Sequence, residues 1–245
     1  MDEAIRLEHV SKKYGRGAHI VSALSDVSLT IAKGEFVSVM GPSGSGKSTL
    51  LNLMAGLDTP KAGRVLVDGH DLAALSDDER SDLRLQHVGM IFQSFNLFAT
   101  FTAEENVSWP LEFLGTKRSE ARTRAGVVLD HVGIPRAAWS RRPAELSGGE
   151  QQRLAVARAV VTGPTLLLAD EPTGNLDSRT GQMILDLLRN LNHTKRLTVV
   201  LVTHSNFAAT YGDRTIEISD GRIVSDGLGP ADARFPEPIS PGPGS

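Results

Sequence analysis

Short apolar runs alternate along this chain with stretches of helical periodicity, and that alternation predicts an α/β fold with a largely parallel sheet. The runs at 36–40, 166–169 and 197–202 are apolar almost throughout, as expected of strands buried on both faces. Further strands are predicted at 5–10, 27–31, 64–68, 88–92, 215–218 and 222–224, and helices at about 47–57, 102–114, 119–132, 151–161 and 179–191.

The middle of the chain differs from the rest because it lacks strand signals. Between about residues 99 and 147 helical periods dominate, which predicts a helical subdomain inserted into the α/β domain. The segment 227–245 is rich in proline and glycine, a composition typical of a disordered tail.

The composition excludes several classes of function. The 245 residues are 40% hydrophobic and 22% charged, as in an ordinary globular protein. A net charge of −3 gives no global positive field, so no nucleic-acid partner is expected. The absence of cysteine excludes disulfides, thiolate metal sites and cysteine nucleophiles. There is no signal-peptide pattern and no apolar run near the roughly 20 residues of a membrane span, so we expect any membrane role to depend on a partner.

A glycine-rich loop follows the predicted strand 36–40 and precedes a predicted helix. It reads Gly41-Pro42-Ser43-Gly44-Ser45-Gly46-Lys47-Ser48, followed by Thr49, and it matches the phosphate-binding pattern G-x-x-x-x-G-K-[ST]. Glycines let backbone N–H groups turn towards phosphate oxygens, and the helix N-terminus adds partial positive charge. Lys47 is expected to reach the β- and γ-phosphates, and the Ser48 hydroxyl to bind Mg²⁺. The loop therefore predicts a Mg-ATP site; the alternative is a flexible Gly/Ser turn.

Two acidic residues, Asp170 and Glu171, directly follow the apolar run 166–169. Ligands of α/β sheets gather at the carboxyl ends of the strands, so both carboxylates are expected beside the loop at 41–48. Asp170 suits the role of holding Mg²⁺, and Glu171 that of a general base for an attacking water. The alternative is a pair of solvated turn residues.

A second anion site is predicted where Leu146-Ser147-Gly148-Gly149-Glu150 precedes a helical stretch. Ser147 and Glu150 have capping-box spacing, so a helix is expected to start here. The two glycines leave the first turn bare, and its N–H groups and dipole favour an anion. On the motif alone, a well-capped helix is the simpler interpretation. Two anion sites for one triphosphate are understandable if each completes the other across a dimer.

These three motifs, in this order, resemble those of the ATP-binding cassette (ABC) family, over the chain to about residue 226. The resemblance implies a P-loop NTPase core with an antiparallel β-subdomain and an inserted α-helical subdomain. It also assigns Gln93 to the loop that senses Mg²⁺ and the γ-phosphate, 175–177 to the D-loop, His204 to the γ-phosphate switch and Tyr14 to stacking on adenine. Taken alone, Gln93 is a polar residue at a strand end, His204 a structural histidine, and Tyr14 a residue that packs a loop.

The amino-acid sequences of the segments 89–97, 146–159 and 170–177 are similar to those of one branch of that family. This branch includes the lipoprotein-release, macrolide-export and cell-division ATPases of the LolD, MacB and FtsE types. Two departures stand out. Ser205 follows His204 where Asp is common in the family, and Phe98-Ala99-Thr100-Phe101 replaces a Leu-Pro-containing stretch near the face expected to contact a membrane partner.

The resemblance implies an ATPase subunit that forms a homodimer around two Mg-ATP and drives a separate integral-membrane permease or an FtsX- or MacB-like subunit. It implies a cytoplasmic location on the inner face of the membrane, through that partner. Expected catalytic residues are Glu171, His204, Gln93 and Lys47; expected metal ligands are Ser48, Gln93 and Asp170; the nucleotide site adds Tyr14, the residues 41–49 and, from a second copy, Ser147 to Glu150.

Three other functions are compatible with parts of this pattern. A cassette ATPase of DNA repair or translation usually carries long insertions or two cassettes, and neither is present. A regulatory module that signals across the membrane without moving cargo stays open, as does the identity of any cargo. A P-loop kinase or GTPase leaves the motif at 146–150 unexplained, and the chain has no Asn-Lys-x-Asp motif.

Overall fold

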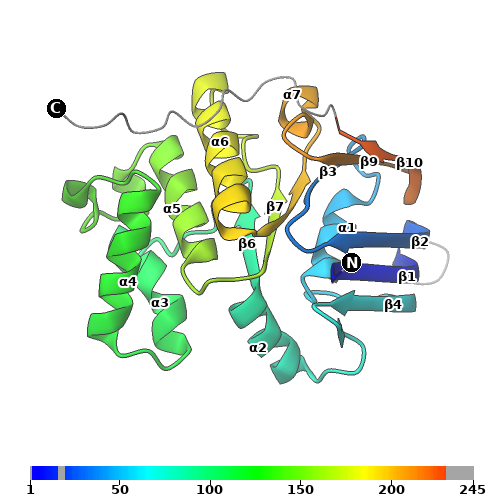
Figure 1. Ribbon diagram of the computed structural model, residues 1–245, viewed down its shortest axis with the longest axis horizontal. Helices are drawn as coiled ribbons and strands as arrows, with labels where there is room; N and C mark the ends of the chain where they lie inside the picture. Colours follow the sequence, from blue (N-terminus) through cyan, green and yellow to red (C-terminus); the bar gives the residue numbers. More distant parts are fainter. Residues whose placement is uncertain (1, 16–19, 230–245) are drawn as a thin grey trace.

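The computed structural model describes residues 2–15 and 20–229, which form two β-sheets and a group of helices (Figure 1). The larger sheet has the strand order β10-β9-β3-β8-β7-β6, and all neighbours in it are parallel except β9 and β10. Its strands are β3 (Phe36–Met40), β6 (Val88–Phe92), β7 (Leu166–Asp170), β8 (Thr198–Val202), β9 (Arg214–Ser219) and β10 (Arg222–Leu228). The predicted α/β fold with a largely parallel sheet is therefore confirmed.

The smaller sheet is antiparallel and has the order β2-β1-β4-β5. Its strands are β1 (Glu3–Tyr14), β2 (Val21–Ala32), β4 (Ala62–Val67) and β5 (His70–Asp71). β1 and β2, with 12 residues each, are at least twice as long as the predicted runs. His9 and Asp26 adopt φ values of 51° and 55° on paired strands whose register shifts between Leu7 and Val10, so the apolar alternation is interrupted where the strands continue.

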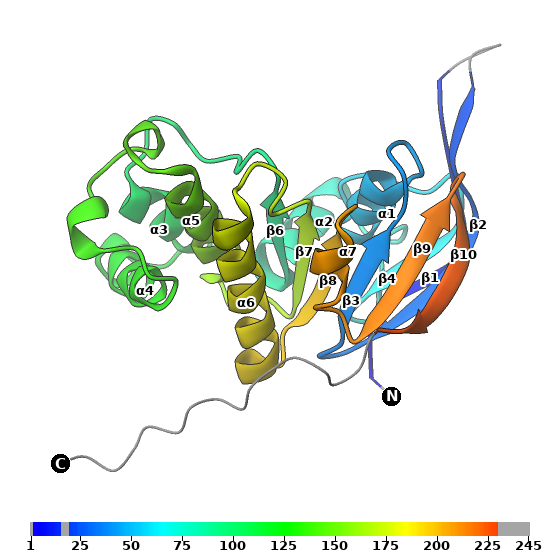
Figure 2. The same ribbon diagram turned by 90° about the horizontal axis from the view of Figure 1, so that it is seen from above.

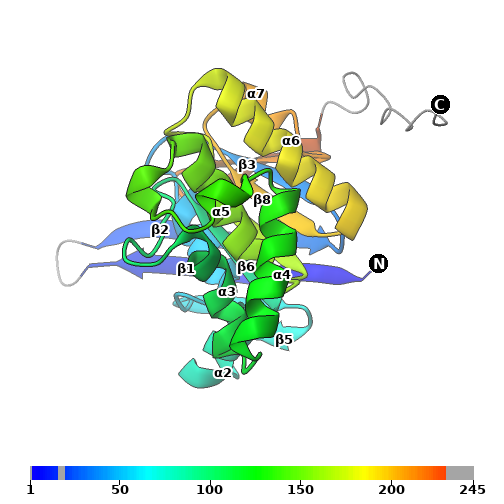
Figure 3. The same ribbon diagram turned by 90° about the vertical axis from the view of Figure 1, so that its left-hand side faces the viewer.

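The helices fall into two groups along the long axis of the molecule. α1 (Lys47–Met54) lies between the two sheets, whereas α3 (Ala103–Phe113), α4 (Arg118–His131) and α5 (Gly148–Val160) cluster at the other end (Figures 1 and 3). Two short 3₁₀ turns, Arg136–Ala138 and Pro143–Glu145, connect α4 to α5, and α6 (Ser178–Lys195) packs beside α5. The stretch without strand signals is thus helical in the structure.

Successive residues of the central strands pack into two different cores, which explains why these runs are apolar without alternation. One core, formed with α1 and the smaller sheet, takes Val37, Val39, Leu166, Leu168, Val200 and Val202. The other, formed with α3 to α6, takes Phe36, Leu167, Ala169, Val199 and Leu201. The sheet is therefore held from both sides, and its carboxyl-end loops are carried on a rigid base.

Three features depart from the sequence-based expectations. The polar helix α2 (Asp77–His87) and the short α7 (Asn206–Ala209) are not among the predicted helices. β10 continues to Leu228, two residues into the segment predicted to be a disordered tail, while residues 230–245 of that segment lie outside the described residues. No helix within 2–15 and 20–229 is long and apolar enough to cross a membrane.

Candidate functional site

The glycine-rich loop 41–46 connects β3 to α1, and its glycines are required by both conformation and space. Gly46 has φ 107°, and a Cβ there would lie 2.4 Å from the carbonyl oxygen of Ala23. At Gly41 (φ 152°) a Cβ would lie 2.1 Å from the carbonyl oxygen of Ile218. The loop is thus wedged against neighbouring backbone, and no side chain at these two positions would fit.

Helix α1 begins without a cap. Its N-cap residue Gly46 makes no side-chain cap bond, and its first turn holds no acidic residue. By contrast, side chains of Ser76, Thr102, Ser147 and Asp177 cap α2, α3, α5 and α6, and α4, which has no side-chain cap, carries an acidic residue in its first turn. The first N–H groups of a helix have no intrahelical acceptor, and the helix dipole adds partial positive charge there. A phosphate group is the kind of partner that suits this end of α1.

Lys47 and Ser48 face the carboxylate of Asp170 from the start of α1. Lys47 is buried, and its Nζ donates to the carbonyl oxygens of Gly41 and Pro42, both at 2.8 Å. Burial raises the pKa of Asp170, while the hydrogen bond from Ser48 and the charge of Lys47 oppose that rise. A hydroxyl and a carboxylate in contact at the end of a strand form a donor set of hard oxygens, which fits Mg²⁺.

Glu171 and His204 contact each other beside this cluster. Glu171 follows β7 with φ 49°, and its N–H donates to the carbonyl oxygen of Val202, the last residue of β8. His204 follows β8, and its Nδ1 lies 2.5 Å from Oε2 of Glu171. The histidine is 67% exposed and the glutamate 19%. The pair therefore combines a sheltered carboxylate with an imidazole that is open to a ligand.

Ser205, the family departure next to the histidine, has a local role. Its side chain accepts a hydrogen bond from the N–H of Ala208 at 3.3 Å and caps α7. Asp and Ser are both favoured N-cap residues, so either suits this position.

Gln93, directly after β6, is turned towards the D-loop. Its Nε2 donates to Oδ1 of Asn175 at 3.4 Å, and Nδ2 of Asn175 donates back to its carbonyl oxygen at 3.0 Å. A Cβ on Gly174 would come within 2.7 Å of Gln93 Nε2, so the two segments pack closely. Gln93 is therefore bonded to Asn175 of the D-loop and makes no hydrogen bond to Asp170.

The start of α5 carries a complete capping box. Ser147 accepts from the N–H of Glu150 at 3.3 Å, and Oε2 of Glu150 accepts from both the Ser147 hydroxyl (2.7 Å) and its N–H (2.8 Å). These bonds lower the pKa of Glu150. Gly149 has a packing role, because a Cβ there would lie 2.5 Å from Cγ2 of Thr180, the third residue of α6. One glycine of the pair is thus needed for helix contact, whatever else it binds.

The structure does not bring α5 to the glycine-rich loop. In two perpendicular views, α5 and α1 lie on opposite sides of β6 and β7 along the long axis (Figures 1 and 2). The predicted sites at 41–49 and 147–150 are therefore separate within one copy.

Tyr14 lies at the end of β1, where its hydroxyl donates to Oδ2 of Asp58 at 2.7 Å. Burial and this bond raise the pKa of Tyr14, and a hydrogen bond involving Thr49 opposes the rise. The hydroxyl is therefore within reach of Thr49, the third residue of α1.

Two polar residues that sequence reasoning missed, one half-buried and one fully buried, hold the segment after Gln93. Arg158 of α5 donates to the carbonyl oxygens of Asn96 (2.5 Å) and Phe95 (3.1 Å), and burial lowers its pKa. Asn106 of α3 is fully buried; it accepts from the N–H of Phe98 at 2.8 Å, and its amide N–H groups donate to three carbonyl oxygens of the segment 98–102. Their only signal in the sequence is polarity within an otherwise apolar helix face.

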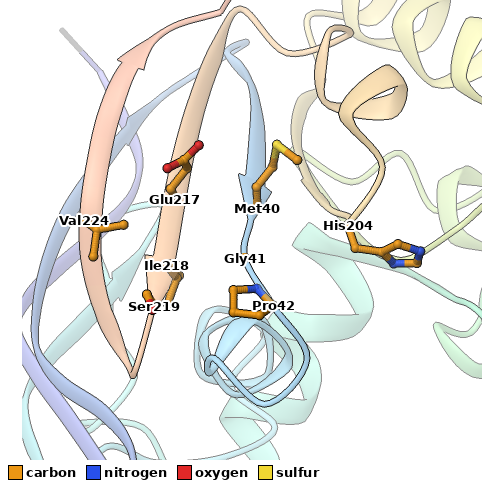
Figure 4. Close-up of a pocket in the computed structure, with 8 residues that line it drawn as sticks. All are labelled: Met40, Gly41, Pro42, His204, Glu217, Ile218, Ser219 and Val224. Atoms are coloured by element: carbon orange, nitrogen blue, oxygen red, sulfur yellow. The ribbon is translucent and has the colours of Figure 1, made fainter.

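A pocket of about 400 Å³ borders the loop on the side of β9 and β10 (Figure 4). The pocket is lined by residues of three segments. These are the end of β3 with the start of the loop (Met40, Gly41 and Pro42), the segment after β8 (His204) and the β9–β10 hairpin (Glu217, Ile218, Ser219 and Val224). Lys47, Ser48 and Asp170 are not among its lining residues, so this pocket lies beside the predicted phosphate site.

Comparisons with known proteins agree with this geometry. A family model described as "ABC transporter" matches residues 24–174. The macrolide export ATP-binding/permease protein MacB of Brucella abortus is 46% identical over 222 residues, which are 91% of this chain and 34% of that protein. An uncharacterized ABC transporter ATP-binding protein of Methanocaldococcus jannaschii, MJ0796, is 46% identical over 89% of this chain and 94% of its own length.

Among solved structures, a dimeric post-hydrolysis state of the ATP-binding cassette MJ0796 bound to ADP and Pi superimposes with a TM-score of 0.86. That similarity covers 91% of this chain and 98% of the other, at 43% identity. The chain thus spans about a third of the length of the MacB protein but nearly all of MJ0796.

Proposed function

Because the chain belongs to the ABC transporter family, we propose that it is an ATP-hydrolysing subunit that dimerises around two Mg-ATP and drives a separate integral-membrane partner. The observation that carries the proposal is the convergence of the uncapped α1, the Ser48–Asp170 contact and the Glu171–His204 pair at the ends of β3, β7 and β8. Residues 1–226 would form the cassette, with 99–147 as its helical subdomain.

The phosphates bind at the start of α1. Backbone N–H groups of 44–49 satisfy phosphate oxygens, and Lys47 exchanges its bonds to Gly41 and Pro42 for the β- and γ-phosphates. Ser48 and Asp170 would hold Mg²⁺, with Gln93 as a third ligand, and the ion would neutralise phosphate charge when bound. Tyr14 supplies a stacking surface for adenine.

Glu171 takes the proton of the attacking water, and His204 fixes the carboxylate. An Nδ1–H donated to Oε2 leaves Oε1 of Glu171 for the water. In the imidazolium form both ring nitrogens carry a proton, so the exposed ring would donate Nε2–H to the γ-phosphate while Nδ1–H holds Glu171, and the pair would link nucleotide state to base orientation.

The second anion site comes from another copy of the chain. Ser147 and Gly149 are separated from the loop at 41–48 within one copy, so a head-to-tail dimer is needed to place both at one γ-phosphate. The dimeric state of the MJ0796 cassette supports dimerisation of this chain. ATP then stabilises the closed dimer more than ADP does, and the difference in affinity drives the motion.

An aromatic surface on the helical side suits the membrane partner. It consists of Phe98, Phe101, Trp109 and Phe113, whose rings form a chain with centroid separations of 5.1, 5.4 and 5.5 Å. Phe113 is 68% exposed, and Asn106 fixes the loop that carries Phe98. The location at the membrane surface follows from this contact, and the cargo is a property of the partner.

Glu171→Gln tests the assignment of the base. The variant keeps the shape of the side chain but cannot accept the proton, so turnover should fall by about 10²- to 10⁴-fold. ATP binding should persist, and ATP should shift the variant to a dimer in size-exclusion chromatography with light scattering.

Glu217→Gln is the matched control, because Glu217 is an exposed carboxylate of the neighbouring pocket. It should leave turnover and oligomeric state unchanged. Wild-type turnover in Glu171→Gln would reject Glu171 as the base, and failure of both variants and the wild type to bind ATP would reject the function itself.

A further inference from the structure

Tyr14 belongs to a compact polar cluster that none of the motifs above includes. Lys12 donates from Nζ to Oδ1 of Asp58 at 2.5 Å and to the carbonyl oxygen of Thr59 at 2.7 Å. The second oxygen of Asp58, Oδ2, accepts from the Tyr14 hydroxyl at 2.7 Å. One carboxylate therefore binds both side chains, although it is 44 positions away from the tyrosine.

The cluster fixes the ring of Tyr14 at two points. Asp58 holds the hydroxyl, and the Lys12 ammonium lies over the ring, 5.1 Å from its centroid, in a cation–π contact. Lys12 is only 13% exposed, whereas Tyr14 remains 42% exposed. The anchoring groups are thus sheltered, and much of the tyrosine stays available to a ligand.

The carboxylate is itself held in place. Oδ1 of Asp58 also accepts from the N–H of Thr59 at 2.7 Å, and the residue lies four positions after the end of α1. Although burial opposes the change, the bonds from Lys12 and Tyr14 lower the pKa of Asp58. An ionised carboxylate is therefore the stable state of this anchor, and it ties the end of β1 to the helix that starts at the phosphate loop.

We propose that Asp58 and Lys12 are positioning residues that hold the Tyr14 ring as a preformed stacking surface for the nucleotide base. The inference rests on the proposed function, since it needs a nucleotide on the adjacent loop. A ring that is already ordered loses little rotamer freedom when a base stacks on it, which favours binding. The cluster acts on the base alone and leaves the phosphate contacts unchanged.

Two ligands separate these effects. ATP uses both the base surface and the phosphate loop, whereas inorganic tripolyphosphate uses only the loop. In Asp58→Asn the neutral amide binds Lys12 and Tyr14 more weakly, so the KM for ATP should rise roughly five- to tenfold while kcat stays unchanged. The inhibition constant of tripolyphosphate should not change. Asp82→Asn, an exposed aspartate of α2, serves as the control and should alter neither.

Tyr14→Phe provides an independent variant that removes only the hydroxyl. It should also raise the KM for ATP, and the double variant should be little worse than Asp58→Asn alone, because Tyr14→Phe removes a bond that Asp58→Asn already weakens. The cluster would be purely structural, and the proposal wrong, if Asp58→Asn weakened ATP and tripolyphosphate equally or weakened neither.

Tyrosinate absorbance gives a readout of the ring itself. The chain has two tyrosines, and burial together with the bond to Asp186 raises the pKa of Tyr211 more than the pKa of Tyr14 is raised. The first tyrosine to ionise in the wild type is therefore Tyr14, and Asp58→Asn should lower its pKa because the anionic acceptor is lost. An unchanged first titration would overturn the anchoring role. A wild type that binds no ATP would instead overturn the proposed function, and the inference with it.

Discussion

Gly149→Ala should destabilise the protein through one contact, the approach of α5 to α6. An added Cβ would lie 2.5 Å from Cγ2 of Thr180, far inside the roughly 3.5–4.0 Å of a favourable carbon contact. Thr180 cannot easily turn its methyl away, because its hydroxyl and its N–H both bind the carboxylate of Asp177. The helices must therefore separate, or Thr180 must give up a hydrogen bond.

The size of the effect follows from two opposing contributions. Overpacking of this kind lowers the free energy of unfolding by about 1–3 kcal/mol. Replacing glycine by alanine in a helix raises it by up to about 1 kcal/mol, because alanine has the higher helix propensity. Gly148→Ala is the matched control, since its Cβ would meet only Cδ2 of Leu176, at an ordinary 3.7 Å. The difference in unfolding free energy between the two alanine variants isolates the overpacking cost and should be about 1–3 kcal/mol.

A double-mutant cycle with Thr180→Ser, measured by urea unfolding, identifies the cause. Serine removes the clashing methyl but keeps the hydroxyl for Asp177, so it should restore most of the stability lost in Gly149→Ala. ATPase activity should not return, because the double variant still carries a methyl group next to the N–H group of residue 149 that we propose binds the γ-phosphate. Equal stability of the two alanine variants would refute the packing argument, and recovery of activity with stability would refute the phosphate role of Gly149.

Two further substitutions probe the site and the segment after Gln93. Asp170→Asn should abolish turnover yet stabilise the nucleotide-free protein at pH 7. Burial raises the pKa of Asp170, so the ionised carboxylate lowers the stability of the wild type as pH rises through the folded pKa. The urea midpoints of variant and wild type should therefore converge below about pH 3.5, where the carboxyl group is protonated in both folded and unfolded protein. Arg158→Met should lower the unfolding free energy by about 1–3 kcal/mol, since two carbonyl oxygens lose their donors. Hydrogen exchange should quicken in the segment 93–98 and stay unchanged in β1; uniform quickening would contradict a local anchor.

The fold could be predicted where burial dictates composition. β3, β7 and β8 are apolar because both faces are covered, and their runs mark them directly. Helix α2 gives no such signal, because Leu83 is its only buried residue and its capping box at Ser76 stands before a run of charges. The predicted strand is also shorter than β1, because the bulge at His9 shifts the register of β1 against β2 and interrupts the alternation of apolar and polar residues.

The site divides in the same way. The loop at 41–48 and the pair Asp170-Glu171 are contiguous in sequence, so spacing alone locates them. The Glu171–His204 contact and the Tyr14–Asp58 bond join residues 33 and 44 positions apart, and only the packing of strands and helices brings them together. Asp58 carries no motif of its own, so its partner could not be inferred before the structure.

The unfinished start of α1 makes the nucleotide a structural element of the protein as well as its substrate. Phosphate groups would satisfy the first N–H groups of the helix, and binding would raise the unfolding free energy with the logarithm of the nucleotide concentration, by about 2.7 kcal/mol at a hundredfold excess over Kd. The empty and loaded forms then differ in the groups that satisfy the N–H groups at the start of α1. Each turnover would therefore break and re-form contacts to these N–H groups, which links the use of ATP to the stability of the helix that follows β3.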